Sequence, residues 1–259
     1  MDNFLFYILY IVNWLEIMYI KLELERNNSM SLYAIGDLHF STSVDKPMDI
    51  FGENWEGHEF KITSSWQDNV NNEDTVLVLG DTSWGINLEQ AKPDLEIING
   101  LPGDKVFVKG NHDYWWTTVT GLNKLYDNMK FLQTNFYEYK DYAICGGRGW
   151  ICPNIVKFDK NDAKIYKREE NRIRLSLESA RKKGYSKFIV ITHYPPTNDQ
   201  LENSIFTELY EEYNVEKVIY GHLHGKESFK MGLKGFRNGV EYILASCDYT
   251  DFKLIKIMD

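Results

Sequence analysis

The chain has 259 residues, of which 43% are hydrophobic and 26% are charged, and its formal net charge at pH 7 is −9. This length and composition indicate one layered α/β domain with a large core rather than several domains. The acidic balance argues against a sequence-independent nucleic-acid binder, which needs a basic patch, although bound cations would still attract an anionic substrate.

The N-terminal segment, residues 1–29, contains an apolar run over residues 4–15 that is broken by Asn13. It lacks the basic start and the cleavage site of a signal peptide, and it is shorter than the roughly 20 apolar residues of a membrane span. Two interpretations stay open: a helix over residues 4–20 that packs or lies on a membrane surface, and a true start at Met30. We favour the second, because Met30 directly precedes the first predicted strand. The main domain then covers residues 30–259.

Short apolar runs along the chain predict strands that are buried on both faces. They lie at residues 32–35, 76–79, 106–108, 188–192 and 218–220. Helices are predicted at residues 88–98, with Asn87 as the cap, and at 115–128, 162–183 and 201–213. Three more strands are predicted at residues 228–231, 242–246 and 253–257. Residues 41–60 are predicted to form an ordered loop or lid beside the first motif, with His58 an ordinary loop histidine.

Each of the first five strands is followed by a short polar motif, and these motifs contain five of the six histidines. This arrangement is typical of ligands held on loops at the C-terminal ends of buried strands. In chain order the motifs are Gly36-Asp37-Leu38-His39, Gly80-Asp81, Gly110-Asn111-His112-Asp113, Thr192-His193-Tyr194 and Gly221-His222-Leu223-His224.

The donor types in these motifs indicate a metal site. Asp, Asn and His offer oxygen and nitrogen donors that suit Mn, Fe, Zn or Mg rather than a thiolate-bound structural metal. Taken alone, Gly80-Asp81 is more often a turn, and a His-x-His pair is more often no metal site at all. Five motifs in this order, each after an apolar run, are hard to obtain as core or turn chemistry, and together they predict a two-metal centre.

In this order the motifs resemble those of the calcineurin-like metallophosphoesterase superfamily, and the similarity covers residues 31–259. The resemblance implies a four-layer α/β/β/α sandwich, in which helices flank two mixed sheets and a dinuclear centre lies at the strand ends. It implies that one divalent ion binds Asp37, His39, Asp81 and His224, and that the other binds Asp81, Asn111, His193 and His222. These ligands accommodate Mn, Fe, Zn, Ni or Mg, and we favour Mn.

The resemblance also implies an activity, the hydrolysis of phosphoester bonds by a hydroxide that bridges the two ions, in a phosphatase or a phosphodiesterase. His112 is expected to stabilise the developing charge and to protonate the leaving oxygen. For Asp113 two roles stay open, orientation of His112 and capping of the local turn. The second motif lacks the further Asp and Arg of the protein Ser/Thr phosphatase branch (G-D-x-x-D-R-G), which weakens assignment to that branch.

Two residues are candidates for substrate contact. Arg148, which lies in the glycine-rich segment Gly146-Gly147-Arg148-Gly149, either reaches a phosphate group or sits in an exposed turn. Tyr194 belongs to a group of aromatic residues that either pack among themselves or form a wall for the leaving group. The other members of this group are Trp55, Trp84, Tyr114, Trp115, Trp116 and Trp150.

The expected partner is a small phosphorylated substrate and not a nucleic acid, and the sequence does not predict an oligomeric state. Cys145, Cys152 and Cys247 lack C-x-x-C spacing, which favours a reduced, cytoplasmic protein. Two alternative functions stay open. One is a scaffold that kept the fold and lost the chemistry, and the other is a membrane-surface pyrophosphatase, which requires that residues 4–20 bind bilayers.

Overall fold

The computed structural model describes residues 30–154 and 158–259. The N-terminal extension over residues 1–29, and with it the choice between its two interpretations, lies outside the described residues. Within the described residues, no helix has both the length and the hydropathy that crossing a bilayer requires.

The first sheet has five strands in the order β11-β1-β2-β3-β4. Strands β1 (Leu32–Ile35), β2 (Thr75–Val78), β3 (Asp104–Phe107) and β4 (Met129–Phe131) run parallel, and β11 (Ile255–Met258) lies antiparallel at the edge. The C-terminal ends of β1, β2 and β3 therefore meet at one edge of this sheet, where the first three motifs follow.

The second sheet has six strands in the order β5-β6-β7-β8-β10-β9. Its centre is parallel and consists of β6 (Tyr142–Gly147), β7 (Lys187–Thr192), β8 (Lys217–Tyr220) and β10 (Val240–Leu244). The edge strands β5 (Tyr137–Tyr139) and β9 (Gly235–Arg237) are antiparallel to their neighbours. The remaining two motifs follow β7 and β8.

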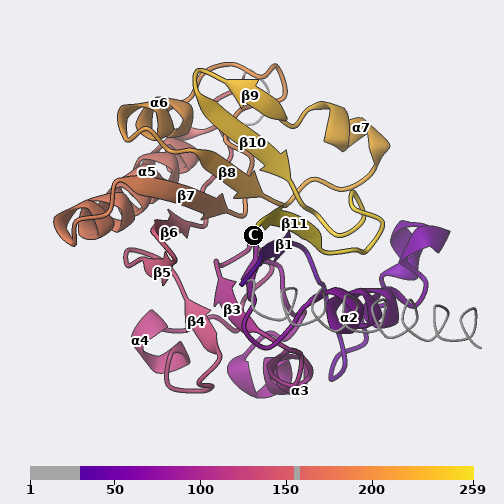
Figure 1. Ribbon diagram of the computed structural model, residues 1–259. Helices are drawn as coiled ribbons and strands as arrows, with labels where there is room; N and C mark the ends of the chain where they lie inside the picture. Colours follow the sequence, from indigo (N-terminus) through magenta and orange to yellow (C-terminus); the bar gives the residue numbers. More distant parts are fainter. Residues whose placement is uncertain (1–29, 155–157) are drawn as a thin grey trace, which may run out of the picture.

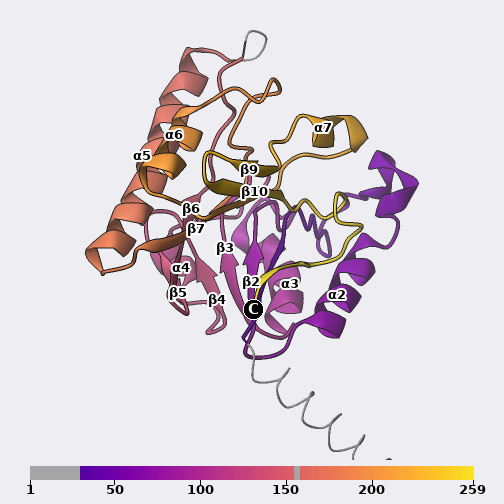
Figure 2. The same cartoon turned by 45° about the horizontal axis from the view of Figure 1, so that its top comes forward.

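Helices cover the outer face of each sheet (Figures 1 and 2). The first sheet is covered by α2 (His58–Asn69) and α3 (Leu88–Asn99), and the second by α5 (Lys160–Lys182) and α6 (Ile205–Glu212). A third apolar cluster, which includes Leu77, Val106, Ile189 and Ile219, fills the space between the two sheets. The order helices, sheet, sheet, helices confirms the predicted four-layer sandwich.

Local capping explains where several helices begin. The side chain of Asn87 accepts a hydrogen bond from the Gln90 N–H, as predicted, and α3 begins at the next residue. Helix α5 begins two residues before its predicted start, because Asp159 and Asp162 form a reciprocal capping box. A second such box, between Ser204 and Thr207, begins α6 at Ile205 rather than at residue 201.

Three predicted elements were wrong in type or extent. Residues 228–231 lie largely in helix α7 (Lys226–Lys230) instead of a strand. Two contacts favour the helix, because the ring of Phe229 packs on Tyr249 and Lys230 pairs with Glu227 one turn away. The helix predicted over residues 115–128 is reduced to α4 (Val119–Leu122) because Thr118 caps it late, and the Asn123 side chain then accepts from the Phe131 N–H instead. Residues 41–60 are ordered but contain two short 3-10 helices, η1 (Asp49–Phe51) and η2 (Glu53–Trp55), and the start of α2.

Candidate metal centre

The two sheets are joined directly at the edge where the motifs lie. The N–H of Gly36, just after β1, donates to the carbonyl oxygen of Ala245 at 2.7 Å, and the N–H of Cys247 donates back to the carbonyl oxygen of Gly36 at 3.0 Å. Ala245 follows β10 in the second sheet, so these bonds align the strand ends of both sheets. All seven predicted ligands meet at this junction.

Asp37, His39 and His224 form the first group of candidate ligands, with ligand atoms within 4.8 Å of one another. The Nε2 of His224 lies 3.5 Å from Oδ1 of Asp37. Asp37 also accepts from the N–H of His222, at 3.1 Å and 2.9 Å to its two oxygens. The carboxylate that follows β1 is thus tied to the loop that follows β8.

Asp37, Asp81 and His193 form the second group. The Nε2 of His193 lies 3.5 Å from Oδ2 of Asp81, 2.7 Å from Oδ1 of Asn111 and 3.1 Å from Nδ1 of His222. Asp81 is 2% exposed, and its Oδ2 is also 3.8 Å from Nε2 of His39. Asp37 and Asp81 therefore lie between histidines from both sheets, as the implied ligand sets require.

The backbone is strained at the ligands themselves. Asp37, His39, Asp81 and His222 have φ values of 61°, 48°, 50° and 72°, in the left-handed region that non-glycine residues rarely adopt. Each such residue costs of order 1–3 kcal/mol and persists only where the surrounding structure holds it. Four of the seven ligand positions carry this cost, which is typical of a site whose geometry serves function.

Two glycines allow the carboxylates to approach the backbone. A Cβ built on Gly110 would lie 2.0 Å from Oδ1 of Asp81, and a Cβ built on Gly221 would lie 2.5 Å from Oδ2 of Asp37. No side chain fits at either distance. The glycines in the G-N-H-D and G-H-x-H motifs are therefore needed for close packing around the ligands.

The outer nitrogen atoms of two ligand histidines are fixed by hydrogen bonds. Nδ1 of His193 lies 2.9 Å from the carbonyl oxygen of Leu79, which can only accept, so this nitrogen carries the proton. Nδ1 of His224 lies 3.0 Å from a carboxylate oxygen of Asp248. Sequence reasoning missed Asp248, which supports His224 from behind, although it comes shortly after a predicted strand, as Asp37 and Asp81 do.

Burial and neighbouring charges shift the pKa values of several carboxylates and histidines in the site. Burial would raise the pKa of Asp37, but the neighbouring histidines, chiefly His224, hold it well below its usual value. Burial lowers the pKa of His224, yet the carboxylates of Asp37 and Asp248 outweigh it and raise this pKa to about 10. Burial, aided by Asp113 and Asp37, raises the pKa of Asp81, and burial lowers the pKa of His222 to about 3.

The donor geometry fits bound cations. Because Nδ1 of His193 donates to a carbonyl oxygen, Nε2 is the nitrogen left to bind a cation, and it lies beside Oδ1 of Asn111 and the carboxylate of Asp81. These oxygen and nitrogen donors converge on one point, where each of them would stabilise a bound cation. In addition, Nδ1 of His39 is buried and has no hydrogen-bond partner among the described residues. The predicted ligands therefore suit metal ions, and the chain is metal-binding.

His112 and Asp113 lie beside the ligands in different surroundings. The His112 N–H donates to Oδ1 of Asp81 at 2.7 Å, and its ring lies 4.5 Å from Trp84 between centroids. Asp113 is fully buried and accepts from the N–H groups of Asp81 at 2.9 Å, Thr82 at 2.8 Å and Gly110 at 2.7 Å. These contacts agree with the capping role considered for Asp113, whose carboxylate holds the two ligand loops together.

A cavity of about 170 Å³ opens onto the centre. Three of the apolar side chains that line it, Met48, Phe51 and Trp55, come from the segment over residues 41–60, so this segment does border the site as predicted. Trp84 completes the wall, and its ring stacks on His39 at 4.9 Å. His58 is buried at the start of α2, with Nε2 3.3 Å from the carbonyl oxygen of His39, so its placement in the loop was wrong.

The two substrate candidates lie apart from this cavity's lining. The ring of Tyr194 is 4.2 Å from that of the candidate ligand His222, between centroids, but does not line the cavity. Arg148 lines a neighbouring cavity, where its guanidinium stacks 4.4 Å from the ring of Trp150. The predicted group of aromatic residues is thus divided: Trp55 and Trp84 line the site, whereas Trp115 is buried in the core.

Comparison with known proteins agrees with this geometry. The family model described as calcineurin-like phosphoesterase matches residues 30–226. No curated protein sequence matches the chain.

Solved structures share the fold at low sequence identity. Protein AQ665 of unknown function from Aquifex aeolicus is 22% identical, with 88% of this chain and 96% of that chain covered and a TM-score of 0.50. The phosphopantetheinyl hydrolase PptH from Mycobacterium tuberculosis is 14% identical, with 89% and 96% covered and a TM-score of 0.50. TT1561 from Thermus thermophilus is 12% identical, with 89% and 99% covered and a TM-score of 0.55.

Proposed function

The chain belongs to the calcineurin-like phosphoesterase family and is a hydrolase of phosphoester bonds, and from this premise we propose that it acts through two divalent metal ions on a small phosphorylated molecule. The observation that carries the proposal is the meeting of seven oxygen and nitrogen ligands from both sheets, with Asp37 and Asp81 at their centre. A scaffold without chemistry is not favoured, because the whole ligand set is present.

The ligands divide between the two ions according to which groups lie together. Asp37, His39 and His224 would hold the first, and Asn111, His193 and His222 the second, with Asp81 shared. When bound, the ions would lower the pKa of water to supply a nucleophile and would neutralise charge on the phosphoryl oxygens. We favour Mn, and the mixed donor set also accommodates Fe, Zn, Ni or Mg.

His112 is the proposed proton donor to the leaving oxygen. Its ring lines the cavity, and its N–H is anchored to Asp81, so that the side chain is held at the edge of the centre. Burial and then the nearby His193 lower the pKa of His112, which leaves the ring neutral in the free protein. An anionic phosphate group in the cavity would raise this pKa again, so that the ring takes up a proton from water and can give it to the leaving oxygen.

The cavity favours a small substrate. Its volume is about 170 Å³, and Met48, Phe51, Trp55 and Trp84 give it an apolar wall on one side of the polar ligands. Such a wall fits an apolar or planar leaving group next to the phosphate. One structural neighbour is named a phosphopantetheinyl hydrolase, so phosphopantetheine esters belong in the first substrate panel.

The test compares hydrolysis of p-nitrophenyl phosphate with that of bis-p-nitrophenyl phosphate. Metal-free protein receives Mn²⁺, Fe²⁺, Zn²⁺, Ni²⁺ or Mg²⁺ in turn, and His112→Ala serves as the matched variant. We expect turnover only with metal, two ions per chain, and a loss of roughly 10²–10⁴-fold in kcat for His112→Ala with its metal content unchanged. Turnover of the diester would make the protein a phosphodiesterase, and turnover of the monoester alone a phosphatase. Metal-independent turnover, or none with both ions bound, would overturn the proposal.

A further inference from the structure

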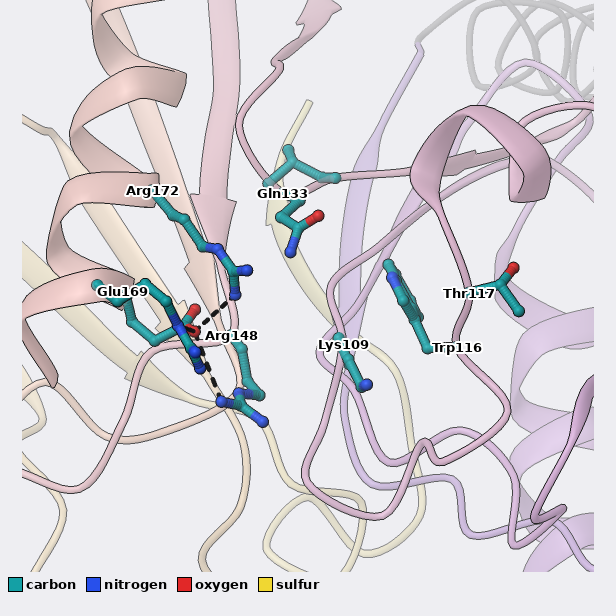
Figure 3. Close-up of a pocket in the computed structure, with 9 residues that line it drawn as sticks. Lys109, Trp116, Thr117, Gln133, Arg148, Glu169 and Arg172 are labelled. Carbon is teal, nitrogen blue, oxygen red and sulfur yellow. Dashed lines mark hydrogen bonds and ion pairs between the residues drawn. The ribbon is translucent and has the colours of Figure 1, made fainter. Parts of the chain in front are cut away.

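A second cavity, of about 250 Å³, lies between helix α5 and the loop that follows β3. Figure 3 shows Glu169 and Arg172 projecting from the helix on one side and Lys109 facing them from the loop on the other. Arg148 lies below them, at the end of β6. This cavity shares no lining residue with the one at the metal centre.

The lining of this cavity is strongly cationic. Lys109, Arg148, Arg168 and Arg172 carry four positive charges and Glu169 one negative charge, which leaves a formal charge of +3. The whole chain, in contrast, has a net charge of −9. A concentration of positive charge on an acidic protein requires an explanation, because like charges at close range repel.

Glu169 organises the arginines. Its side chain is 1% exposed, and its Oε1 lies 2.7 Å from Arg172 and 3.5 Å from both Arg148 and Arg168. One oxygen thus pairs with three guanidinium groups and accepts a hydrogen bond from Arg172, so it satisfies few of their N–H donors. A guanidinium has five N–H donors and matches the oxygens of a phosphate group.

Several polar groups of the cluster remain unsatisfied. Nε of Arg148, a donor, is buried and has no hydrogen-bond partner among the described residues. Oε2 of Glu169 has none there either, but it is an acceptor and calls for a donor. The ammonium of Lys109 makes no hydrogen bond or ion pair within residues 30–154 and 158–259. Buried polar groups are normally paired, so unpaired donors around a cavity indicate a missing acceptor.

We propose that this cavity binds a phosphate group. Thr117 and Gln133, which also line it, add neutral donors to the cationic ones. Charge-assisted hydrogen bonds to phosphate are about twice as strong as neutral ones, and the organised arginines lose little entropy in forming them. Arg148 therefore contacts a phosphate group in this second cavity and not at the metal centre.

The chain connects this site to the metal centre. Lys109 is followed by Gly110 and the ligand Asn111, and the carbonyl oxygen of Arg148 accepts from the N–H of His193 at 3.1 Å. The bound phosphate group has two possible sources. One is a second phosphate on the hydrolysed substrate, which rests on the proposed function, and the other is a free anion, which does not.

The first test counts phosphate ions bound by the Mn²⁺-loaded protein, by equilibrium dialysis with radiolabelled inorganic phosphate. Lys109→Gln removes a cation that makes no hydrogen bond or ion pair in the described part of the fold, and Arg172→Gln removes one that is paired with Glu169. Lys164→Gln is the control, since it makes the same charge change at an exposed position of α5. We expect two phosphate ions on the wild type and the control, and affinity for one of them at least roughly tenfold lower in each cavity variant.

The second test separates the two sources by kinetics on a sugar bisphosphate and its monophosphate. A higher KM of Lys109→Gln for the bisphosphate alone would identify the second phosphate of the substrate. If Lys109→Gln hydrolyses both substrates with wild-type kinetics but binds less inorganic phosphate, the bound group is a free anion. Phosphate binding by both cavity variants equal to that of Lys164→Gln would overturn the site. A second phosphate ion bound without turnover of any ester would refute only the proposed function.

Discussion

The ring of His224 lies between two carboxylates, with Nε2 3.5 Å from Oδ1 of Asp37 and Nδ1 3.0 Å from Oδ1 of Asp248. The second oxygen of Asp248 accepts from the N–H of Gly225 at 3.1 Å, so the carboxylate is itself fixed. A carboxylate behind a metal-binding histidine sets the tautomer and the ring orientation and increases the basicity of the coordinating nitrogen. Asp248 thus fixes the ring of His224, and we propose that it positions this ring for a metal ion.

Asp248→Asn should weaken metal binding without unfolding the protein. Loss of such a supporting carboxylate typically costs roughly 10–100-fold in metal affinity or activity. Metal titration and kcat measurement check this, with Asp251→Asn as the control, because Asp251 is exposed and pairs only with Lys253 among the described residues. Equal metal affinity in the two variants would contradict a positioning role for Asp248.

Metal affinity should rise with pH. The pKa of His224 is raised to about 10, because the carboxylates of Asp37 and Asp248 outweigh the lowering effect of burial. Below that value the metal-free protein holds a proton that a metal ion must displace, so affinity falls as pH falls. We expect roughly a tenfold change per pH unit between pH 6 and pH 8 from this proton. Calorimetry in buffers of different ionisation enthalpy would count the protons released, and a pH-independent affinity would refute the assignment.

Asp113→Asn should reduce both stability and metal content. The Asp113 carboxylate accepts from four backbone N–H groups, those of Asp81, Thr82, Ser83 and Gly110, and from Nε1 of Trp115 at 3.0 Å, which joins the loops of Asp81 and Gly110. An amide can replace only one of its oxygens as an acceptor, so we expect a loss of roughly 2–4 kcal/mol in the free energy of unfolding. Denaturant unfolding and metal analysis measure both effects. Unchanged stability with a shifted pH profile of kcat would instead support orientation of His112.

The candidate ligands could be identified from the sequence because each lies in a short motif after an apolar run, and the structure brings them together. Asp248 lies in no such motif, and its partner His224 is 24 residues away. Its position after a predicted strand was nevertheless the same signal that marked Asp37 and Asp81. Glu169 was hidden for another reason, because it lies on a helix rich in charges and pairs with Arg148, which is distant in the sequence.

The prediction of secondary structure failed where side chains compete with the backbone. The cap formed by Thr118 and the turn bonds of Asn123 shortened a helix that apolar periodicity predicted to continue to residue 128. Residues 228–231 were predicted to form a strand, whereas contacts made elsewhere in the fold favoured a helical turn. Such contacts cannot be read from a local window of sequence.

Lys105 is a fully buried cation on β3, away from the ligands. Its side chain is 0% exposed, and its Nζ donates to the carbonyl oxygen of Leu101. Burial lowers its pKa from 10.5 to about 8, against the opposing effect of Asp104. Since the folded pKa lies below the unfolded one, the charged form destabilises the fold at pH values under about 8. This penalty disappears as pH rises toward 10.5.

Lys105→Met should therefore be more stable relative to the wild type at pH 7 than at pH 10. The side chain of methionine fills a similar space without charge, and we expect the stability difference between variant and wild type to change by about 2 kcal/mol over this range. Denaturant unfolding of both metal-free proteins at each pH measures it. Lys124→Met, at an exposed position, should show no such change. A pH-independent difference for Lys105→Met would mean that Lys105 keeps an ordinary pKa in the folded protein, and that the Leu101 carbonyl oxygen and local water solvate its charge.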